Sequence, residues 1–386
     1  MSKKKIAILG STGSIGKTLI KIINKDYKSF EVVLLTANKD YSTLLKQAKK
    51  FNVKNLIITN SKSYKILKKK CRRLNINVFN NYEILDKIFK KKIDYVMSSI
   101  SGLEGLVPTF KIIKYTKNIA IANKEAIICG WNLIKKELLK NNTKFIPVDS
   151  EHFSVWYGLK NNNDLIERIY LTASGGPFLK LPLAQFKKIK LQDALNHPNW
   201  KMGKKISIDS ATMMNKVFEI IEAKNIFNLK YNDLSILTHP QSFVHAIIKF
   251  KNGLIKIIAH KTSMEIPIFN TLYSNSKILK TNELDIKYIN NLEFFKLDIK
   301  KYPVVKILND LPNKSSLFET VIVSANDQLV DLYLRNKINF TKISNTMLKI
   351  IKLREFIKYK KNHPKSVQEI INLSTYVRLK VNSICI

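Results

Sequence analysis

The chain has 386 residues, 45% of them hydrophobic, so it can bury a substantial core, and at roughly 100–200 residues per domain it should form two or three domains. Its formal charge of +38 suggests a polyanionic partner, but the lysines are spread over the whole length without interleaved stacking aromatics, so we expect no specific nucleic-acid partner. No apolar run is long enough to span a membrane and the three scattered cysteines argue against a disulfide framework, so we expect a cytoplasmic protein that does not contact membranes.

The first part of the chain alternates short apolar runs with segments of helical periodicity. The expected strands are residues 4–9, 30–36, 55–58, 93–97, 118–122 and 145–148. The expected helices between them are residues 17–23, 41–51, 64–74 and 106–115. This alternation predicts an α/β domain over residues 1–149, with a Rossmann-like parallel sheet that binds ligands at the carboxyl ends of its strands.

The pattern changes after residue 149. A helix is expected at 211–224 and antiparallel strands at 235–237, 244–250 and 254–259, which predicts an α+β catalytic domain over residues 150–272. Residues 273–300 have no strong periodicity and are interpreted as a linker. Helical patterns at 303–308, 317–334, 342–359 and 366–383 then predict a small C-terminal helical bundle over residues 301–386.

The segment GSTGSIG at residues 10–16 follows the first strand and opens a helix. Glycines there allow a sharp turn and a close approach of the backbone to a pyrophosphate, although an ordinary tight turn could carry the same residues. Asn38 and Lys39 follow the second strand, where an NAD-binding domain usually has an acid. Lys39 could pair with a 2′-phosphate, which favours NADPH, or it could be one more surface lysine.

Carboxylates recur at two places. Asp149 and Glu151 follow the strand at 145–148, and on an extended segment their side chains would point the same way. A helix places Asn215 and Glu219 on one face. Oxygen ligands of this kind suit Mg²⁺ or Mn²⁺, although a lone glutamate on a helix is more often solvated.

Three further segments suggest substrate binding. Lys124 follows a strand and could hold an anion or polarise a carbonyl, while Asn123 beside it could equally be a helix cap. The small residues at 173–177 can form an anion-binding turn. His197 and Trp200 lie in a loop punctuated by proline and glycine, which is either a lid over a ligand or an ordinary surface loop.

These motifs occur together in one order: GSTGSIG, ANKE, PVDSEH, SGGPF, HPNWKMG and KISIDSATMMNK, followed by HPQS and KYPVVK. In this the chain resembles the 1-deoxy-D-xylulose 5-phosphate reductoisomerase family over essentially its whole length. The resemblance implies a homodimeric enzyme that rearranges this small phosphosugar and reduces the product to 2-C-methyl-D-erythritol 4-phosphate. It implies NADPH and Mg²⁺ or Mn²⁺ as cofactors, in a step of non-mevalonate isoprenoid synthesis.

The resemblance also assigns roles to residues. It implies NADPH contacts from Thr12, Gly13, Ser14, Ile15, Asn123, Glu125 and Gly203. It implies metal binding by Asp149, Glu151 and Glu219, and catalytic roles for these three and for Lys124 and His197. It implies substrate binding by Lys124, Ser150, Glu151, Ser174, His197, Ser210, Asn215, Lys216 and Glu219, of which Ser174, Ser210, Asn215 and Lys216 surround the phosphate. Trp200 would lie on the lid.

Some positions depart from the family pattern. Asn38 stands where a glycine is usual, and Asp40 where an asparagine is usual, so an inward-pointing Asp40 would weaken the NADPH preference. Residues 317–320 replace a glycine-rich helix start. Two alternatives remain: another NADP-linked oxidoreductase, which would leave the carboxylates without a role, and a basic nucleic-acid-binding protein, which would show steeply salt-dependent binding.

Overall fold

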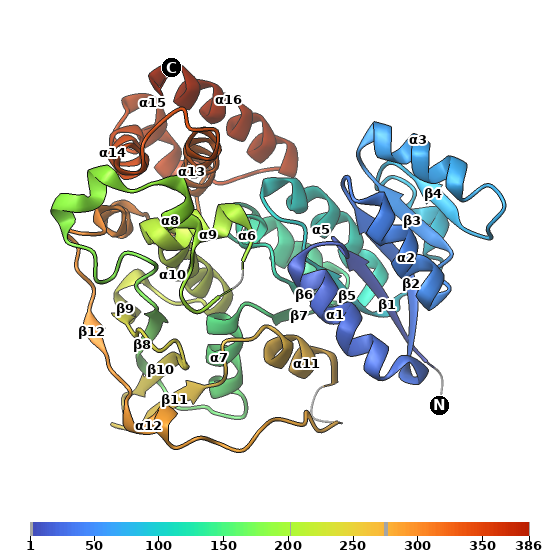
Figure 1. Ribbon diagram of the computed structural model, residues 1–386, viewed down its shortest axis with the longest axis horizontal. Helices are drawn as coiled ribbons and strands as arrows, with labels where there is room; N and C mark the ends of the chain where they lie inside the picture. The colour runs from blue at the N-terminus through green and yellow to red at the C-terminus, as the bar shows by residue number, and fades with distance from the viewer. Residues whose placement is uncertain (1–2, 201, 274–276, 386) are drawn as a thin grey trace. The chain divides into compact units, whose positions relative to one another are not determined.

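The computed structural model describes residues 3–200, 202–273 and 277–385, which form two compact units. The first unit consists of Met1–Ala126, Leu133–Asp149 and Met264–Leu279. The second unit consists of Ile127–Asn132, Ser150–Ser263 and Lys280–Ile386. Each unit has its own sheet, and Figure 1 labels the elements of both.

The sheet of the first unit is seven-stranded and parallel throughout, in the order β4-β3-β2-β1-β5-β6-β7. Its strands are β1 (Lys4–Leu9), β2 (Phe30–Ala37), β3 (Asn55–Ile58), β4 (Asn77–Phe79), β5 (Ile93–Ser98), β6 (Thr116–Ile121) and β7 (Lys144–Pro147). The predicted parallel α/β domain is therefore confirmed. Among the strands, the prediction omitted only the edge strand β4, which is too short to show an apolar pattern.

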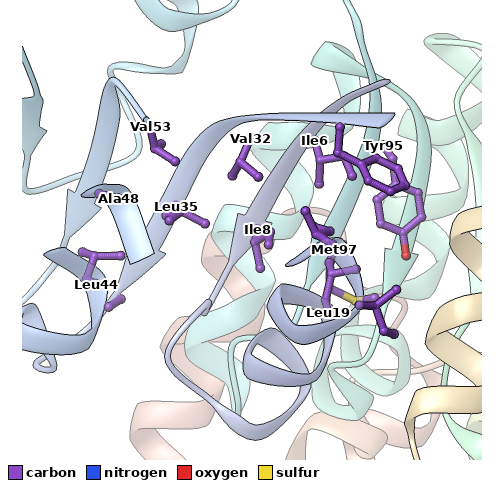
Figure 2. Close-up of a cluster of buried hydrophobic side chains, with 14 of the residues drawn as sticks. Ile6, Ile8, Leu19, Val32, Leu35, Leu44, Ala48, Val53, Tyr95 and Met97 are labelled. Atoms are coloured by element: carbon purple, nitrogen blue, oxygen red, sulfur yellow. The ribbon is translucent and has the colours of Figure 1, made fainter. Parts of the chain in front are cut away.

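Helices connect these parallel strands, as the geometry of parallel pairing requires. They are α1 (Ser14–Lys25), α2 (Tyr41–Phe51), α3 (Ser61–Lys70), α4 (Leu85–Ile88), α5 (Leu106–Ile112) and α6 (Lys124–Lys140), with short 3₁₀ turns at Tyr27–Ser29, Leu103–Gly105 and Ile113–Tyr115. Figure 2 shows part of the core, where apolar side chains of β1 and β2 meet those of α1 and α2. Burial of this face fixes the register of β1 and so places the glycine turn that follows it.

A segment from much later in the chain completes this core. Helix α11 (Glu265–Tyr273) packs against α1, and Ile268 and Leu272 are fully buried in the same cluster as the strands. The Tyr95 and Thr271 hydroxyl oxygens lie 2.9 Å apart, and the Lys4 ammonium donates to the Leu272 carbonyl at 2.7 Å. Contacts thus group α11 with the first unit.

The second unit contains a five-stranded mixed sheet in the order β11-β10-β8-β9-β12. Its strands are β8 (Ile166–Ala173), β9 (Leu234–Thr238), β10 (Val244–Phe250), β11 (Ile255–Ala259) and β12 (Phe295–Lys296). The expected antiparallel pairing holds for β10 with β11, whereas β9 does not pair with β10 and instead pairs parallel with β8 and antiparallel with β12. The central strand β8 was missed, because its first half carries exposed charged residues.

The helices expected in this unit are present, with two corrections to their bounds, but those at Ser150–Leu159, Leu191–Leu195, Lys204–Thr212 and Lys287–Asn290 were not predicted. The helices of this unit are α7 (Ser150–Leu159), α8 (Leu191–Leu195), α9 (Lys204–Thr212), α10 (Met214–Phe227), α12 (Lys287–Asn290), α13 (Phe318–Leu334), α14 (Phe340–Ile350), α15 (Arg354–Ile357) and α16 (Val367–Cys385), with 3₁₀ segments at Leu183–Lys188, Tyr231–Asp233, Pro303–Asp310 and Lys358–Lys361. The helix expected at 211–224 begins instead at Met214, because Met213 adopts a left-handed conformation that ends α9. The helix expected at 342–359 is broken after Ile350.

The C-terminal helices form the expected bundle, in which α13 packs against both α14 and α16. Across the residues that the structure describes, no helix combines the length and the apolar character needed to cross a membrane.

Candidate active site

The glycine turn between β1 and α1 has the geometry that its sequence predicts. Gly10 has a φ of +81°, and a Cβ there would lie 2.8 Å from the Ser99 carbonyl oxygen. A Cβ at Gly16 would lie 2.4 Å from the Gly10 carbonyl oxygen. Gly13 is the N-cap of α1, and Ser14 and Ile15 form its first turn. Thr12 is half-buried and precedes this cap. The turn thus brings backbone amides close to the helix N-terminus, where an anion is stabilised.

The same turn is anchored by side chains that the sequence analysis did not identify. The Gly10 amide donates to the Thr36 hydroxyl at 2.9 Å. Ser11 and Gln47 form a reciprocal buried pair: the Ser11 hydroxyl donates to the Gln47 side-chain oxygen at 2.7 Å, and the Gln47 amide donates to the Ser11 carbonyl at 2.9 Å. A polar residue in the α2 segment gives no signal of this role, because its partner lies 36 residues away.

The residues after β2 include the one that departs from the family pattern, Asp40. Asp40 is the N-cap of α2, and its carboxylate accepts a hydrogen bond from the Thr43 amide at 3.0 Å. Asn38 donates to the Thr59 hydroxyl at 2.8 Å, and Lys39 is exposed. One carboxylate oxygen of Asp40 therefore caps its own helix, and the side chains of both Lys39 and Asp40 are exposed at this strand end.

The sequence after β6 allowed two interpretations: a helix cap at Asn123, or a binding role for Lys124 beside it. Asn123 caps α6, since its side-chain oxygen accepts from the Ala126 amide at 2.5 Å, and it also donates to the Gly102 carbonyl at 2.6 Å. Lys124 is buried and its ammonium contacts the Asp149 carboxylate. Glu125 is buried in the first turn of α6. The cap is thus confirmed, whereas the NADPH contacts of Asn123 and Glu125 stay predictions.

Three carboxylates come together. Asp149, Glu151 and Glu219 each offer one oxygen, and these oxygens all lie within 4.8 Å of one another. The extended segment expected for the first two was wrong, because Ser150 already begins α7, so Glu151 lies in the first turn of a helix. The Ser150 hydroxyl donates to the carboxylate of Glu151. Such a cluster of hard oxygen donors suits Mg²⁺ or Mn²⁺.

Helix α10 supplies the counter-charge to this cluster. The Lys216 ammonium lies 3.0 Å from a Glu151 oxygen and also contacts Glu219, and Asn215 donates to Glu219 at 2.5 Å. Burial alone would lower the pKa of Lys216, but the two carboxylates outweigh it and raise the pKa above its usual value. Glu219 is 1% exposed, so the interpretation as a solvated helix face is wrong.

The buried histidines His152, His245 and His260 were not singled out from the sequence. The His152 Nε2 lies 2.9 Å from the Glu219 carbonyl oxygen, which fixes α7 against α10. The His245 and His260 rings stack with centroids 3.8 Å apart. Burial and His260 together lower the pKa of His245 to about 4, so this ring is neutral near pH 7.

In the loop after β8, the Ser174 hydroxyl oxygen lies between two hydrogen-bonding partners, His197 and Gly176. The His197 Nδ1 accepts hydrogen bonds from the Asn199 and Trp200 amides at 3.2 and 3.0 Å, so the ring proton lies on Nε2. That nitrogen lies 3.1 Å from the Ser174 hydroxyl oxygen, which also accepts from the Gly176 amide at 3.1 Å. With two donors directed at its oxygen, the Ser174 hydroxyl can donate its own hydrogen to an incoming anion.

The remaining predicted residues lie on or beside α9. Gly176 has a φ of +66° and packs on the α9 backbone, where a Cβ would lie 3.0 Å from the Ser210 carbonyl oxygen. Ser210 is half-buried within α9 and does not precede the helix as expected. Gly203 is the N-cap of α9, in the second unit, so its expected NADPH contact stays a prediction. The Trp200 ring meets His245 edge-on, with centroids 6.2 Å apart.

Comparison with known proteins agrees with this geometry. Residues 6–130 match the family model described as 1-deoxy-D-xylulose 5-phosphate reductoisomerase, and residues 145–227 and 260–380 match models of its C-terminal domains. The chain is 59% identical, over 99% of its length and 100% of the relative's, to the 1-deoxy-D-xylulose 5-phosphate reductoisomerase of Pelagibacter ubique. The chain belongs to the 1-deoxy-D-xylulose 5-phosphate reductoisomerase family.

More distant reductoisomerases show the same similarity. The enzyme of a Wolbachia pipientis strain from Culex pipiens is 36% identical over 99% of this chain and 97% of its own length. A solved structure of the Zymomonas mobilis reductoisomerase in complex with NADPH superposes with a TM-score of 0.87 at 29% identity, covering 100% of this chain and 99% of the other. A reductoisomerase solved with NADPH, fosmidomycin and magnesium superposes with a TM-score of 0.90 at 28% identity, over 98% of both chains.

Proposed function

We propose that this chain converts 1-deoxy-D-xylulose 5-phosphate to 2-C-methyl-D-erythritol 4-phosphate, with NADPH as reductant and a divalent cation, Mg²⁺ or Mn²⁺. It thereby supplies isoprenoid synthesis by the non-mevalonate pathway. The observation that carries the proposal is the cluster of Asp149, Glu151 and Glu219, because a simple hydride-transfer enzyme has no use for it. The full-length similarity to reductoisomerases, two of them solved with NADPH and one with magnesium, supports it.

The carboxylate cluster fits the cation. Asp149, Glu151 and Glu219 would hold it with oxygen ligands, and its chemistry there is to polarise the substrate ketone and stabilise negative charge on oxygen. Asn215 and Lys216 orient Glu219 from one side, and the His152 ring holds its backbone from the other. We assign Lys124 to the same end of the substrate, because its ammonium reaches Asp149 and can hold an oxygen that gains charge.

A second group of side chains would bind the substrate phosphate. Ser174 offers the hydroxyl hydrogen that His197 and Gly176 leave unused. Ser210 follows on the helix packed against Gly176, and Lys216 carries a buried positive charge. We assign Ser174, Ser210, Asn215 and Lys216 to the phosphate, and Ser150 and His197 to the sugar. Neutral His197 holds its loop by two backbone hydrogen bonds, so it orients the substrate by hydrogen bonding rather than by charge.

The first unit would bind NADPH at its glycine turn. Thr12, Gly13, Ser14 and Ile15 lie around the N-terminus of α1 and would contact the pyrophosphate. Asn38 and the exposed Lys39 lie at the end of β2 and would meet the 2′-phosphate, because Asp40 is engaged as a helix cap. We also assign Asn123, Glu125 and Gly203 to the cofactor. Trp200 would act as a lid that excludes water during reduction.

The proposal includes a homodimer in the cytoplasm. Strand β11 is an edge strand that exposes Ile255 and Ile257, and Leu254 just before it is exposed too, so a second copy could cover these apolar side chains. Ile257→Lys should then shift the chain to monomer in sedimentation velocity, whereas the exposed Leu284→Lys outside the sheet should not. An unchanged sedimentation coefficient would remove this edge as the interface. Cys71 and Cys385 are free thiols, which suits a reducing compartment.

The test is NADPH oxidation with 1-deoxy-D-xylulose 5-phosphate, measured with and without Mg²⁺ or Mn²⁺. We expect oxidation that needs both substrate and cation and that is lost in Glu219→Gln, whereas Glu283→Gln, an exposed carboxylate, should be normal. Oxidation of other substrates without a cation would instead favour a different NADP-linked oxidoreductase. Steeply salt-dependent binding to RNA or DNA in place of turnover would favour a nucleic-acid-binding protein.

A further inference from the structure

Helix α9 is tied to the C-terminal helices by a polar network whose carboxylates are buried and which no step of the proposed reaction uses. We name it the α9 clamp: Lys205 and Asp209 of α9, Asn326 and Asp327 of α13, and Arg378 of α16. We propose that the α9 clamp positions Ser210 for the substrate phosphate, so that the C-terminal bundle sets substrate affinity without touching substrate. This rests on the phosphate role proposed for Ser210.

The contacts form a continuous chain across three helices. The Asn326 side-chain amide donates to one Asp209 oxygen at 2.7 Å, and the Lys205 ammonium lies 3.0 Å from the other. The same ammonium lies 3.0 Å from one Asp327 oxygen, and the other oxygen of Asp327 accepts from Arg378 at 2.8 Å. Each of the two carboxylates, Asp209 and Asp327, therefore has a partner at both of its oxygens.

Burial makes these contacts specific. Asp209 is 2% exposed and Asp327 8% exposed, so the buried charge of each carboxylate would be strongly unfavourable without its partners. A network of this kind adds little net stability compared with apolar packing, but breaking one partner leaves a charge uncompensated. The network therefore selects one rotation of α9 about its axis over the others.

That rotation decides where Ser210 points. Successive side chains on a helix are turned by about 100°. Asp209 is directed at α13, so the adjacent Ser210 cannot face α13 as well. A second constraint comes from Gly176, whose backbone packs on Ser210 and Ala211 so closely that a Cβ would lie 3.0 Å from the Ser210 carbonyl oxygen. Helix α9 is thus held between the Ser174–Gly176 turn and the C-terminal bundle, and Ser210 lies on the part of α9 that faces the turn.

The experiment breaks and then restores the Asn326–Asp209 bond. Asn326→Leu should raise the KM for 1-deoxy-D-xylulose 5-phosphate about tenfold, which corresponds to one hydrogen bond to a buried carboxylate. The inhibition constant of inorganic phosphate should rise in parallel, with kcat and the KM for NADPH within about twofold. The exchange Asp209→Asn with Asn326→Asp keeps one amide, one carboxylate and the lysine partner, and should restore the KM.

Gln328→Leu is the matched control. Gln328 lies on the same helix and donates to Asn382 of α16 at 2.8 Å, but it makes no contact with α9 among the hydrogen bonds of the described residues. A general loosening of the bundle would raise the KM in this control as well, and would overturn the proposal. If Asn326→Leu does not fold, Arg378→Met removes the outer partner of Asp327 and should raise the KM in the same direction.

Ser210→Ala distinguishes a failure of the α9 clamp proposal from a failure of the phosphate role proposed for Ser210. If Ser210→Ala and Asn326→Leu both raise the KM for substrate and the inhibition constant for phosphate, the α9 clamp acts as proposed. If only Ser210→Ala does so, the phosphate site stands and the clamp proposal is overturned. If Ser210→Ala leaves both constants unchanged in an enzyme that turns over normally, the phosphate role of Ser210 fails, and the clamp proposal fails with it.

Discussion

Glu319→Gln should stabilise the second unit at pH 8 and leave its stability nearly unchanged at pH 4. Glu319 is completely buried at the start of α13, and burial raises the pKa of its carboxyl from 4.5 to about 7. Hydrogen bonds from Ser316 and the charge of Lys224 oppose this rise without cancelling it. Its Oε1 accepts no hydrogen bond from the part of the chain that the structure describes.

The sign and size follow from the two pKa values. Because the folded-state pKa is raised, the carboxyl favours folding fully below about pH 4.5, and this contribution is lost as the pH rises through about 7. Each pH unit between these values costs about 1.4 kcal/mol, so the ionised carboxylate costs about 3 kcal/mol by pH 8. Glutamine removes that charge, but Lys224 then loses its counter-charge, so we expect a net gain of roughly 2 kcal/mol.

Urea unfolding followed by tryptophan fluorescence measures this effect. All three tryptophans, Trp131, Trp156 and Trp200, belong to the second unit, so fluorescence reports its unfolding. The unfolding free energy of Glu319→Gln relative to the parent chain should rise between pH 4 and pH 8, whereas Glu283→Gln, an exposed carboxylate, should show no such trend. An equal gain at both pH values, or a loss at pH 8, would refute the reasoning.

Three further changes test the site. Gln47→Leu removes both hydrogen bonds to Ser11 and should raise the KM for NADPH about tenfold without changing the KM for the phosphosugar. An equal rise in both KM values would contradict a role confined to the glycine turn. Gly176→Ala introduces a Cβ at positive φ, 3.0 Å from the Ser210 carbonyl oxygen. It should lower the free energy of unfolding in urea by about 1–3 kcal/mol and raise the phosphosugar KM. A free energy of unfolding equal to that of the parent would show that the turn can relax. Burial lowers the pKa of His197 to about 4, so its ring should not titrate between pH 6 and 8. NMR spectra of labelled histidine test this, because the His197 resonance is the one missing from His197→Gln. A titration midpoint near 6.5 would show that the ring is solvated.

Local patterns predicted the first unit well and the second less well. Strand β1, the glycine turn and α1 are determined by residues next to one another, and burial on both faces makes the strands apolar throughout. Strand β8 escaped prediction because its charged first half does not show that it lies between β10 and β9. The break at Met213 also escaped prediction, because a left-handed methionine is an exception to local preference.

In the candidate site too, features determined by neighbouring residues were predicted, and features that depend on distant partners were not. The spacing of Asp149, Glu151 and Glu219 indicated a cation site, although the backbone reason given for the first two was wrong. The roles of Gln47 and His152 could not be foreseen, because each depends on a partner brought close only by the fold. Hydrogen bonds between distant segments carry no local signature.

The return of α11 to the first unit has a consequence for synthesis of the chain. Residues 264–273 complete the core around α1, yet they follow strands β8 to β11 of the second unit in sequence. During synthesis on the ribosome, the first unit would have an uncovered apolar face until Tyr273 had emerged. A chaperone would have its binding surface during this interval, and a fragment ending at residue 149 should aggregate rather than fold as an autonomous domain.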